Sequence, residues 1–415
     1  MAFCTKLMQR DRNIKPVDML VYFITESLKG CVSYNDLAAK IHAETGTLVS
    51  KQAYHKKINA HCLEFFEKVL AVVMQAKLQP EQAPNCVQGF ARVLVHDSTV
   101  IRFPSKLMPV FSGVKNAHAQ VCNARIQSAY DLRSGGFVKF SIDTYRKNDL
   151  SAASELELKP GDLVLRDRGY FTLDEFRRII DAKADFVSRY KHKKKLYHPA
   201  TGAAINLIDL LKKHGNLDMP VLAGKDQQTK LCLIAIKVDE ETANSRRRKA
   251  KKQVRGHNPS KEILFLMGWS IYISSLTDQQ LGIEGLIQLY RLRWRIETIF
   301  KTWKSYFHFD HIHNVGRNQF KIILTARMIA MTLFYQVIYT PLIQPVRHHC
   351  KKELSLMKLM RYIQRNLTAI LPLLKASQLC ADSLKIVAKY CTYDTRKRQN
   401  FNQMKQEILN TRLLS

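Results

Sequence analysis

The sequence predicts a mixed α/β fold flanked on both sides by helical segments, and three observations predict it. Two short continuous apolar runs, residues 93–95 and 163–165, are typical of strands buried on both faces. Residues 125–145 alternate apolar and polar positions around a Gly-Gly turn, which is typical of a hairpin. A helical pattern follows the second apolar run. The order strand, hairpin, helix, strand, helix, strand indicates an α/β protein with a mixed sheet.

The charge of the chain favours one class of partner. The 415 residues suffice for two or three domains at about 150 residues each, and 46% apolar residues are ordinary for a folded chain. The 66 Lys and Arg residues against 35 Asp and Glu residues give a formal net charge of +31. So large a field of one sign repels itself unless a polyanion neutralises it. Nucleic acid is therefore the leading partner, and an anionic membrane surface is the alternative.

Membrane residence and secretion are both disfavoured. The least charged stretch, Met328 to Ile343, is shorter than the ~20 apolar residues of a membrane span and contains Gln336 and Pro341, so we expect a buried helix. The N-terminus has no apolar core of a signal peptide. Nine cysteines with no C-x-x-C pair indicate reduced, mostly buried thiols in a cytoplasmic protein.

The N-terminal residues 1–85 are expected to be helical. Ser33 followed by Asp36 predicts the start of a helix, and Gly46 predicts a turn before a second helix near Ser50 that is rich in basic side chains. Two short helices joined by such a turn are typical of a helix-turn-helix DNA-binding element. A generic helical bundle with a solvated face explains the same residues equally well.

The predicted sheet places two aspartates at strand ends. The first apolar run ends at the motif HDST, residues 96–99, and the second ends at the motif DRGY, residues 167–170. A helix over 173–184 and a strand over 186–190 follow. Residues at the strand ends of an α/β sheet are held rigidly at its edge, so Asp97 and Asp167 are candidate functional residues.

Residues 191–276 differ in character from the rest of the core. Strand-like pieces at 231–238 and 271–276 flank the run SRRRKAKKQVRG, residues 245–256, which holds seven basic residues and no acid. We expect a β-rich insertion that carries a mobile basic loop. From Gln279 onward, the pattern is helical to the end of the chain.

The segment from Leu286 to Phe307 is predicted to be one long helix with two stripes. Apolar residues repeat at three and four positions and form the buried stripe Leu289, Leu292, Ile296, Ile299 and Trp303. A second stripe about 100° away holds Tyr290, Arg293, Glu297 and Lys304. Together with Asp97 and Asp167, Glu297 supplies the oxygen ligands that pairs of hard divalent cations prefer. Carboxylates at strand ends also commonly serve as caps or loop anchors.

The stripe also carries a family resemblance. Tyr290-x2-Arg293-x3-Glu297-x6-Lys304 matches at every position the Y-x2-R-x3-E-x6-K signature of the DDE transposases of the bacterial insertion sequence four family, which includes the transposon-five transposase. HDST and DRGY resemble the first and second acidic motifs of that family, in the same order. The resemblance covers residues 90 to 310.

The resemblance implies a fold, a reaction and a domain organisation. It implies a ribonuclease-H-like, retroviral-integrase-like catalytic core at 90–315, interrupted by the β-rich insertion at 191–276. The flanking parts would be a DNA-end-binding domain at 1–85 and a helical, dimerising domain at 316–415. The implied activity is cut-and-paste transposition, with Mg²⁺, or Mn²⁺ in its place, bound by Asp97, Asp167 and Glu297. No nucleotide cofactor is expected, because no phosphate-binding glycine loop occurs.

The resemblance also assigns DNA contacts and partners. It implies that Tyr290, Arg293 and Lys304 contact the transposon end, and that Trp269 holds a flipped base if the reaction passes through a DNA hairpin. A core tryptophan on a strand is an equally weighted interpretation of Trp269, and helix packing explains Trp294 nearly as well as stacking does. The basic run assigns backbone contacts to Arg246, Arg247, Arg248 and Lys249. The expected partners are transposon-end and target DNA and a second subunit, in a nucleoid-associated prokaryotic protein.

Two other functions stay open on the sequence alone. The chain could be a catalytically silent, transposase-derived DNA-binding regulator, or a nuclease that cuts without joining. The histidines of HFDHIHN, residues 308–314, are not expected to bind a metal, because no cysteine set lies near them.

Overall fold

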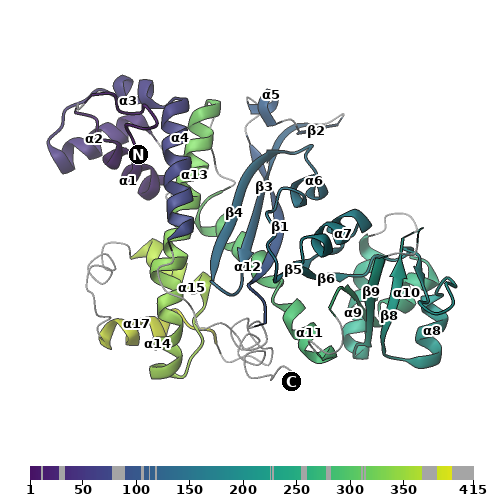
Figure 1. Cartoon of the computed structure of the whole chain (residues 1–415). Coiled ribbons are helices and arrows are strands. Elements are labelled where there is room, and N and C mark those ends of the chain that lie inside the picture. Colours follow the sequence, from purple (N-terminus) through teal and green to yellow (C-terminus); the bar gives the residue numbers. More distant parts are fainter. Residues whose placement is uncertain are drawn as a thin grey trace. The chain divides into compact units, whose positions relative to one another are not determined.

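We describe the protein from a computed structural model of the whole chain (Figure 1). The structure describes every residue except a set of short segments and the C-terminal end: 11–12, 28–32, 77–88, 104–106, 112, 117–118, 225, 227–228, 254–258, 277–281, 310–311, 313–314, 367–380 and 395–415. The expectations for Cys31, Cys86, Cys380, His311 and His313 therefore lie outside the described residues.

The chain divides into two compact units. Among the described residues, unit 1 lies within 1–76, 98–148 and 294–394, and unit 2 lies within 89–97 and 149–293. Strand β1 (Arg92–Phe103) passes from unit 2 into unit 1 between Asp97 and Ser98. The predicted domain limits at 85, 90, 315 and 316 stay predictions.

The N-terminal helices of unit 1 begin and end where local sequence predicts. They are α1 (Pro16–Ser27), α2 (Tyr34–Thr45), α3 (Lys51–Lys57) and α4 (Ala60–Gln75). The Ser33 hydroxyl accepts a hydrogen bond from the Asp36 backbone N–H, and Gly46 ends α2 in the left-handed conformation with φ of 70°. The predicted pair of short helices is thus confirmed, while its DNA-binding role stays a prediction.

The strands of unit 1 form an antiparallel group. They are the second part of β1, β2 (Gly113–Asn116), β3 (Ala119–Asp131) and β4 (Gly136–Thr144), with the short helix α5 (Met108–Phe111) between β1 and β2. Strand β3 pairs with β2 through its first residues, with β4 through the rest, and with β1 on its other side. The predicted hairpin over 125–145 is confirmed.

The C-terminal helices of unit 1 follow its strands. They are α12 (Trp294–Tyr306), α13 (Arg317–Leu333), a π-helical segment η4 (Phe334–Tyr339), α14 (Thr340–Cys350), α15 (Leu356–Arg365) and α17 (Ala381–Tyr390). Figure 1 shows α4 running alongside α13. The helical run 317–350 is long and apolar enough to cross a membrane, but 78% of its most apolar window is buried in the structure, as expected of a core helix. The predicted buried helix at Met328 to Ile343 is confirmed.

The strands of unit 2 are partly parallel. They are the first part of β1, β5 (Asp162–Arg166), β6 (Asp185–Arg189), β7 (Leu196–Tyr197), β8 (Leu217–Ala223), β9 (Thr229–Lys237) and β10 (Trp269–Ser274). Their order is β1-β5-β6-β10-β9-β8-β7, with β1, β5 and β6 parallel and the others antiparallel. The protein is therefore a mixed α/β protein with a large mixed sheet.

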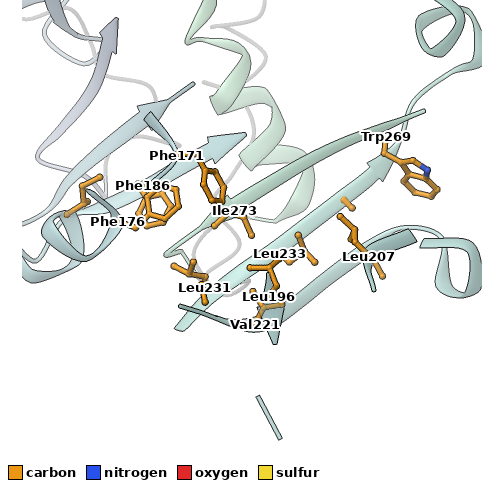
Figure 2. Close-up of a cluster of buried hydrophobic side chains, with 14 of the residues drawn as sticks. Phe171, Phe176, Phe186, Leu196, Leu207, Val221, Leu231, Leu233, Trp269 and Ile273 are labelled. Atoms are coloured by element: carbon orange, nitrogen blue, oxygen red, sulfur yellow. The ribbon is translucent and has the colours of Figure 1, made fainter. Parts of the chain in front are cut away.

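The helices of unit 2 surround a core of aromatic and aliphatic side chains. They are α6 (Asp149–Ala153), the 3₁₀ turn η3 (Arg168–Tyr170), α7 (Leu173–Asp181), α8 (Leu207–His214), α9 (Glu240–Gln253), α10 (Lys261–Leu266) and α11 (Ile283–Arg291). Phe176 of α7 stacks on Phe186 of β6 with ring centroids 4.2 Å apart. Figure 2 shows this pair in one cluster with Leu233 and Ile273 of the adjoining strands.

Three predictions about elements were wrong. The basic run is not a loop: its described residues form most of helix α9, since the segment from Glu240 has no helix breaker and begins with the acids Glu240 and Glu241, which favour a helix N-terminus. Strand β1 does not end at HDST but continues to Phe103, because Thr99, Ile101 and Phe103 are buried in alternation with Val100 and Arg102.

The third wrong prediction was a single helix from Leu286 to Phe307. Helix α11 ends at Arg291 and α12 begins at Trp294. The Leu292 and Arg293 backbone N–H groups donate to the carbonyls three residues earlier, at 3.0 Å each, so the chain makes a tight turn there. The side chains of Tyr290 and Arg293 are buried and bonded within unit 2, and these tertiary contacts override the helical pattern.

We expect substitutions of the two tryptophans of α12 to have very different effects on stability. Trp303 is fully buried and packs against Phe137, Phe140 and Phe309, whereas Trp294 is 58% exposed. We expect Trp303→Ala to lower the free energy of unfolding by about 3–5 kcal/mol through loss of packing and creation of a cavity. Trp294→Ala should change it by less than about 0.5 kcal/mol. Urea unfolding followed by circular dichroism measures both, and equal midpoints for the two variants would contradict this packing.

Candidate active site

The two predicted aspartates follow paired residues of adjacent parallel strands. In the register of β1 and β5, Val95 pairs with Leu165, so Asp97 and Asp167 each lie two residues beyond the last pair. Both side chains are half-buried. Because parallel strands run in the same direction, the two carboxylates leave β1 and β5 at the same level of unit 2. The placement of Asp167 directly after its strand is confirmed, whereas Asp97 lies inside β1.

A buried polar network lies directly before the two aspartates. The guanidinium of Arg166, which is fully buried, donates from Nη1 to Nδ1 of His96 at 2.7 Å and from Nη2 to Glu175 at 2.6 Å. Arg178 donates to the same carboxylate from Nε at 2.9 Å. The Arg166 guanidinium also lies over the Tyr170 ring, 4.8 Å from its centroid. Burial lowers the pKa of Arg166, and Glu175 acts in the opposite direction.

Tyr290 fixes the backbone beside the second aspartate. Its hydroxyl donates to the Arg166 carbonyl at 2.9 Å, and its side chain is almost wholly buried. Burial raises the pKa of Tyr290 above the ordinary value, so the phenol stays a neutral hydrogen-bond donor. The ring contacts Tyr272 of β10 edge-on, with centroids 5.0 Å apart.

Arg293 approaches the first aspartate. Its Nη1 lies 3.5 Å from Oδ2 of Asp97, and the guanidinium is buried while the carboxylate is 23% exposed. A cation that bound to Asp97 would compete with this ion pair. The two signature residues Tyr290 and Arg293 are thus held inside unit 2, each beside one of the predicted metal ligands.

The remaining signature residues lie in unit 1. Glu297 is half-buried in the first turn of α12, Lys304 is half-buried near the end of that helix, and Trp294 is exposed at its start. Within the described part of the chain, no group of three or more His, Cys, Asp and Glu residues is placed to hold a metal ion. The chemistry of the predicted donors nonetheless fits Mg²⁺ or Mn²⁺, because carboxylate oxygens are ligands that these hard cations prefer.

The predicted DNA-binding residues of the insertion divide into buried and exposed groups. Trp269 is 9% exposed and belongs to the core cluster of unit 2, which favours its interpretation as a core residue (Figure 2). Arg246 donates to the Trp269 carbonyl at 2.9 Å, and Arg247 donates to the Leu264 carbonyl at 3.2 Å, so both attach α9 to its neighbours. Arg248 and Lys249 are exposed.

Two other acids of the sheet have structural partners. Asp162, which is fully buried, forms an ion pair with Arg92 of the neighbouring strand. Asp131 accepts hydrogen bonds from the backbone N–H groups of Arg133 and Ser134 at the hairpin turn. These contacts explain both residues without a catalytic role.

Sequence reasoning missed His96, Arg166 and Glu175. One signal was present: Arg166 directly follows the apolar run Leu163 to Leu165, at a position where a buried strand continues. A charged residue there requires buried partners, and the adjacent strand and helix supply them.

Comparison with known proteins identifies the class. The transposase for insertion sequence element IS231D of Bacillus thuringiensis subsp. finitimus is 28% identical over 356 residues, which cover 80% of this chain and 74% of that protein. The transposase for insertion sequence element IS1151 of Clostridium perfringens is 25% identical over 366 residues, covering 81% and 76%. A chain in a cryo-EM structure of the piggyBac transposase synaptic complex with hairpin DNA is also similar, at 10% sequence identity. The match covers 97% of this chain and 83% of that chain, and its TM-score of 0.42 is too low to assign a fold.

The family described as "Transposase DDE domain" matches residues 88–333, more than half of the chain. The protein therefore belongs to this family of transposases. The matched range includes Asp97, Asp167 and Glu297, as well as Tyr290 and Arg293.

The Tyr290 hydrogen bond has a measurable contribution to stability. We expect Tyr290→Phe to lower the free energy of unfolding by about 1 kcal/mol, since one buried hydrogen bond is lost. The folded-state pKa is raised, so the contribution is fully present below the unfolded value of about 10 and is lost progressively as pH rises from there through the folded value. Urea unfolding at about pH 6 and about pH 9 should give the same difference between the two proteins. Above about pH 10 the difference should shrink, and a difference that stays constant there would contradict the raised pKa.

Proposed function

We propose that this protein is the transposase of an insertion sequence, which cleaves the DNA ends of its element and joins them to target DNA. The observation that carries the proposal is that Asp97 and Asp167 lie at the same level on adjacent parallel strands. Both residues are inside the range that the transposase family matches. The related insertion sequence transposases, which are similar over about four-fifths of the chain, support the same function.

Three residues would hold the metal ions. We propose that Glu297 joins Asp97 and Asp167 as an oxygen ligand of two Mg²⁺ ions, or Mn²⁺ in their place. Bound there, the ions would supply an activated water or 3′-hydroxyl and stabilise the leaving oxygen of the phosphodiester. The ribonuclease-H-like core that the resemblance implies belongs to this proposal, as does a reaction through a hairpin end.

The chain's own residues would bind and orient the DNA. Arg293 carries a planar guanidinium that can donate two hydrogen bonds to a phosphate, whereas Lys304 offers a point charge. Exposed Trp294 is an aromatic surface beside Arg293 on which a base could stack. The net charge of +31 supports binding to end and target DNA. We further propose that two subunits act together through residues 316–415, and that the protein works at the prokaryotic nucleoid.

A DNA-binding regulator without catalysis is the second candidate, and a nuclease without joining activity is the third. The Arg293–Asp97 ion pair gives some support to the regulator, because it occupies a predicted metal ligand. An assay with pre-cleaved 3′-hydroxyl ends and a target plasmid separates the three. Joined products identify a transposase, cleavage alone identifies a nuclease, and binding alone identifies a regulator.

The first test removes one proposed ligand. We expect Glu297→Gln to lower Mg²⁺-dependent cleavage of end DNA more than about 100-fold, since even outer partners of a metal ligand contribute about 10–100-fold. DNA binding, measured by gel shift, should persist. Asp181→Asn, a similar change at an exposed position at the end of α7, is the matched control and should cleave normally. Wild-type cleavage by Glu297→Gln would falsify the three-acid assignment.

The second test concerns helix α9. We expect the double change Arg248→Gln with Lys249→Gln to weaken DNA binding and to reduce the slope of log affinity against log salt by about 2, for two lost phosphate contacts. Arg246 and Arg247 are left intact because they attach the helix. Lys212→Gln with Lys213→Gln, on exposed positions of α8, removes the same charge as a control. Equal salt slopes for the two double variants would show that Arg248 and Lys249 of α9 make no specific contact with DNA.

A further inference from the structure

The buried network of His96, Arg166 and Glu175 lies beneath the two aspartates of unit 2. His96 and Arg166 come directly before Asp97 and Asp167 and are almost fully buried, while the aspartates are half-buried. Successive side chains of an extended strand point to opposite faces. The backbone at Asp167 is extended, with φ of −85° and ψ of 168°, and Asp97 lies within β1. The network and the carboxylates therefore occupy opposite faces of the same two strands.

The bond between His96 and Arg166 joins the two strands at this level. A guanidinium can only donate, so Nδ1 of His96 must accept and the ring must carry its proton on Nε2. This side-chain bond crosses from β1 to β5 one residue beyond their last paired residues, Val95 and Leu165. It therefore holds the two strands together directly before each aspartate.

Helix α7 anchors the network from the other side. Glu175 accepts from Arg166 and from both Nε and Nη2 of Arg178, and Arg178 also donates to the carbonyls of Ala153 and Leu156. A buried network whose members are joined by charged hydrogen bonds is rigid, because loss of one partner leaves a buried charge uncompensated.

The peptide of Asp167 is fixed on both sides. The carbonyl before it accepts from the Tyr290 hydroxyl, and its own carbonyl accepts from the Tyr170 backbone N–H at 3.0 Å. The Tyr170 ring returns to the network, with its centroid 5.5 Å from that of the His96 ring. Through Tyr170, the second acidic motif therefore contacts His96, the residue directly before Asp97.

We infer that His96, Arg166 and Glu175 are positioning residues that set the separation and direction of the Asp97 and Asp167 carboxylates for divalent cations. This inference rests on the proposed function, since it assigns the network to the same metal site. The three residues touch neither the metal nor the DNA. They act through the backbone of the strands that carry the ligands.

The experiment compares two substitutions at His96. His96→Asn keeps an acceptor near the position of Nδ1, whereas His96→Leu removes it at similar size. We expect His96→Leu to raise the Mn²⁺ concentration for half-maximal cleavage of end DNA about tenfold or more, in the range seen for partners of metal ligands. His96→Asn should stay within about threefold of the wild type, because the Arg166 bond is retained. Direct Mn²⁺ binding to the full chain, measured by electron paramagnetic resonance, should change in parallel.

A merely structural role would give a different result. If the network only stabilises the fold, His96→Leu would lower the amount of active protein, and the half-saturating Mn²⁺ concentration would not change. That outcome overturns the inference and leaves the proposed function intact. A wild-type protein that neither binds Mn²⁺ nor cleaves end DNA would overturn the proposed function itself. If His96→Leu does not fold, Glu175→Gln provides the same comparison, since it removes the countercharge but keeps the size of the side chain.

Discussion

The burial of the Arg166 guanidinium is the constraint on which the surroundings of the two aspartates depend. A cation without water is tolerated in a protein only when its hydrogen bonds and its charge are matched by partners. Here the partners come from three directions: a histidine on the adjacent strand, a glutamate on the covering helix and the ring of the tyrosine in the second motif. Each of these contacts also restricts a piece of backbone next to a predicted ligand.

Two residues of the predicted signature are also bonded beside the two aspartates. Tyr290 bonds to the backbone at Arg166, and Arg293 pairs with Asp97. Both belong to the end of α11 and the tight turn after it. These contacts tie both side chains into unit 2.

Much of the fold could be predicted from the sequence because it depends on local chemistry. Ser33 and Gly46 set the limits of α2 through a cap and a left-handed turn, and the apolar run before Asp167 specifies β5. Where prediction failed, distant contacts decided. The continuation of β1 beyond Asp97 and the turn at Leu292 follow from burial and from bonds to residues more than a hundred positions away, which periodicity alone does not report.

The candidate site shows the same division. Asp97, Asp167 and the residues of the signature could be put forward as site residues from motifs, because the identity of those residues is itself the signal. His96, Arg166 and Glu175 could not be assigned a role, since their importance depends on which strand lies next to which. The parallel register of β1 and β5 supplies that information.

The three tryptophans of the chain lie in usefully different environments. Trp269 and Trp303 are buried in the cores of units 2 and 1, and Trp294 is the one whose indole faces solvent, directly after Arg293. Intrinsic fluorescence of the unmodified protein therefore contains one component that emits at long wavelength and is open to iodide quenching. That component originates next to the family signature, so the chain carries its own optical reporter of events at this position.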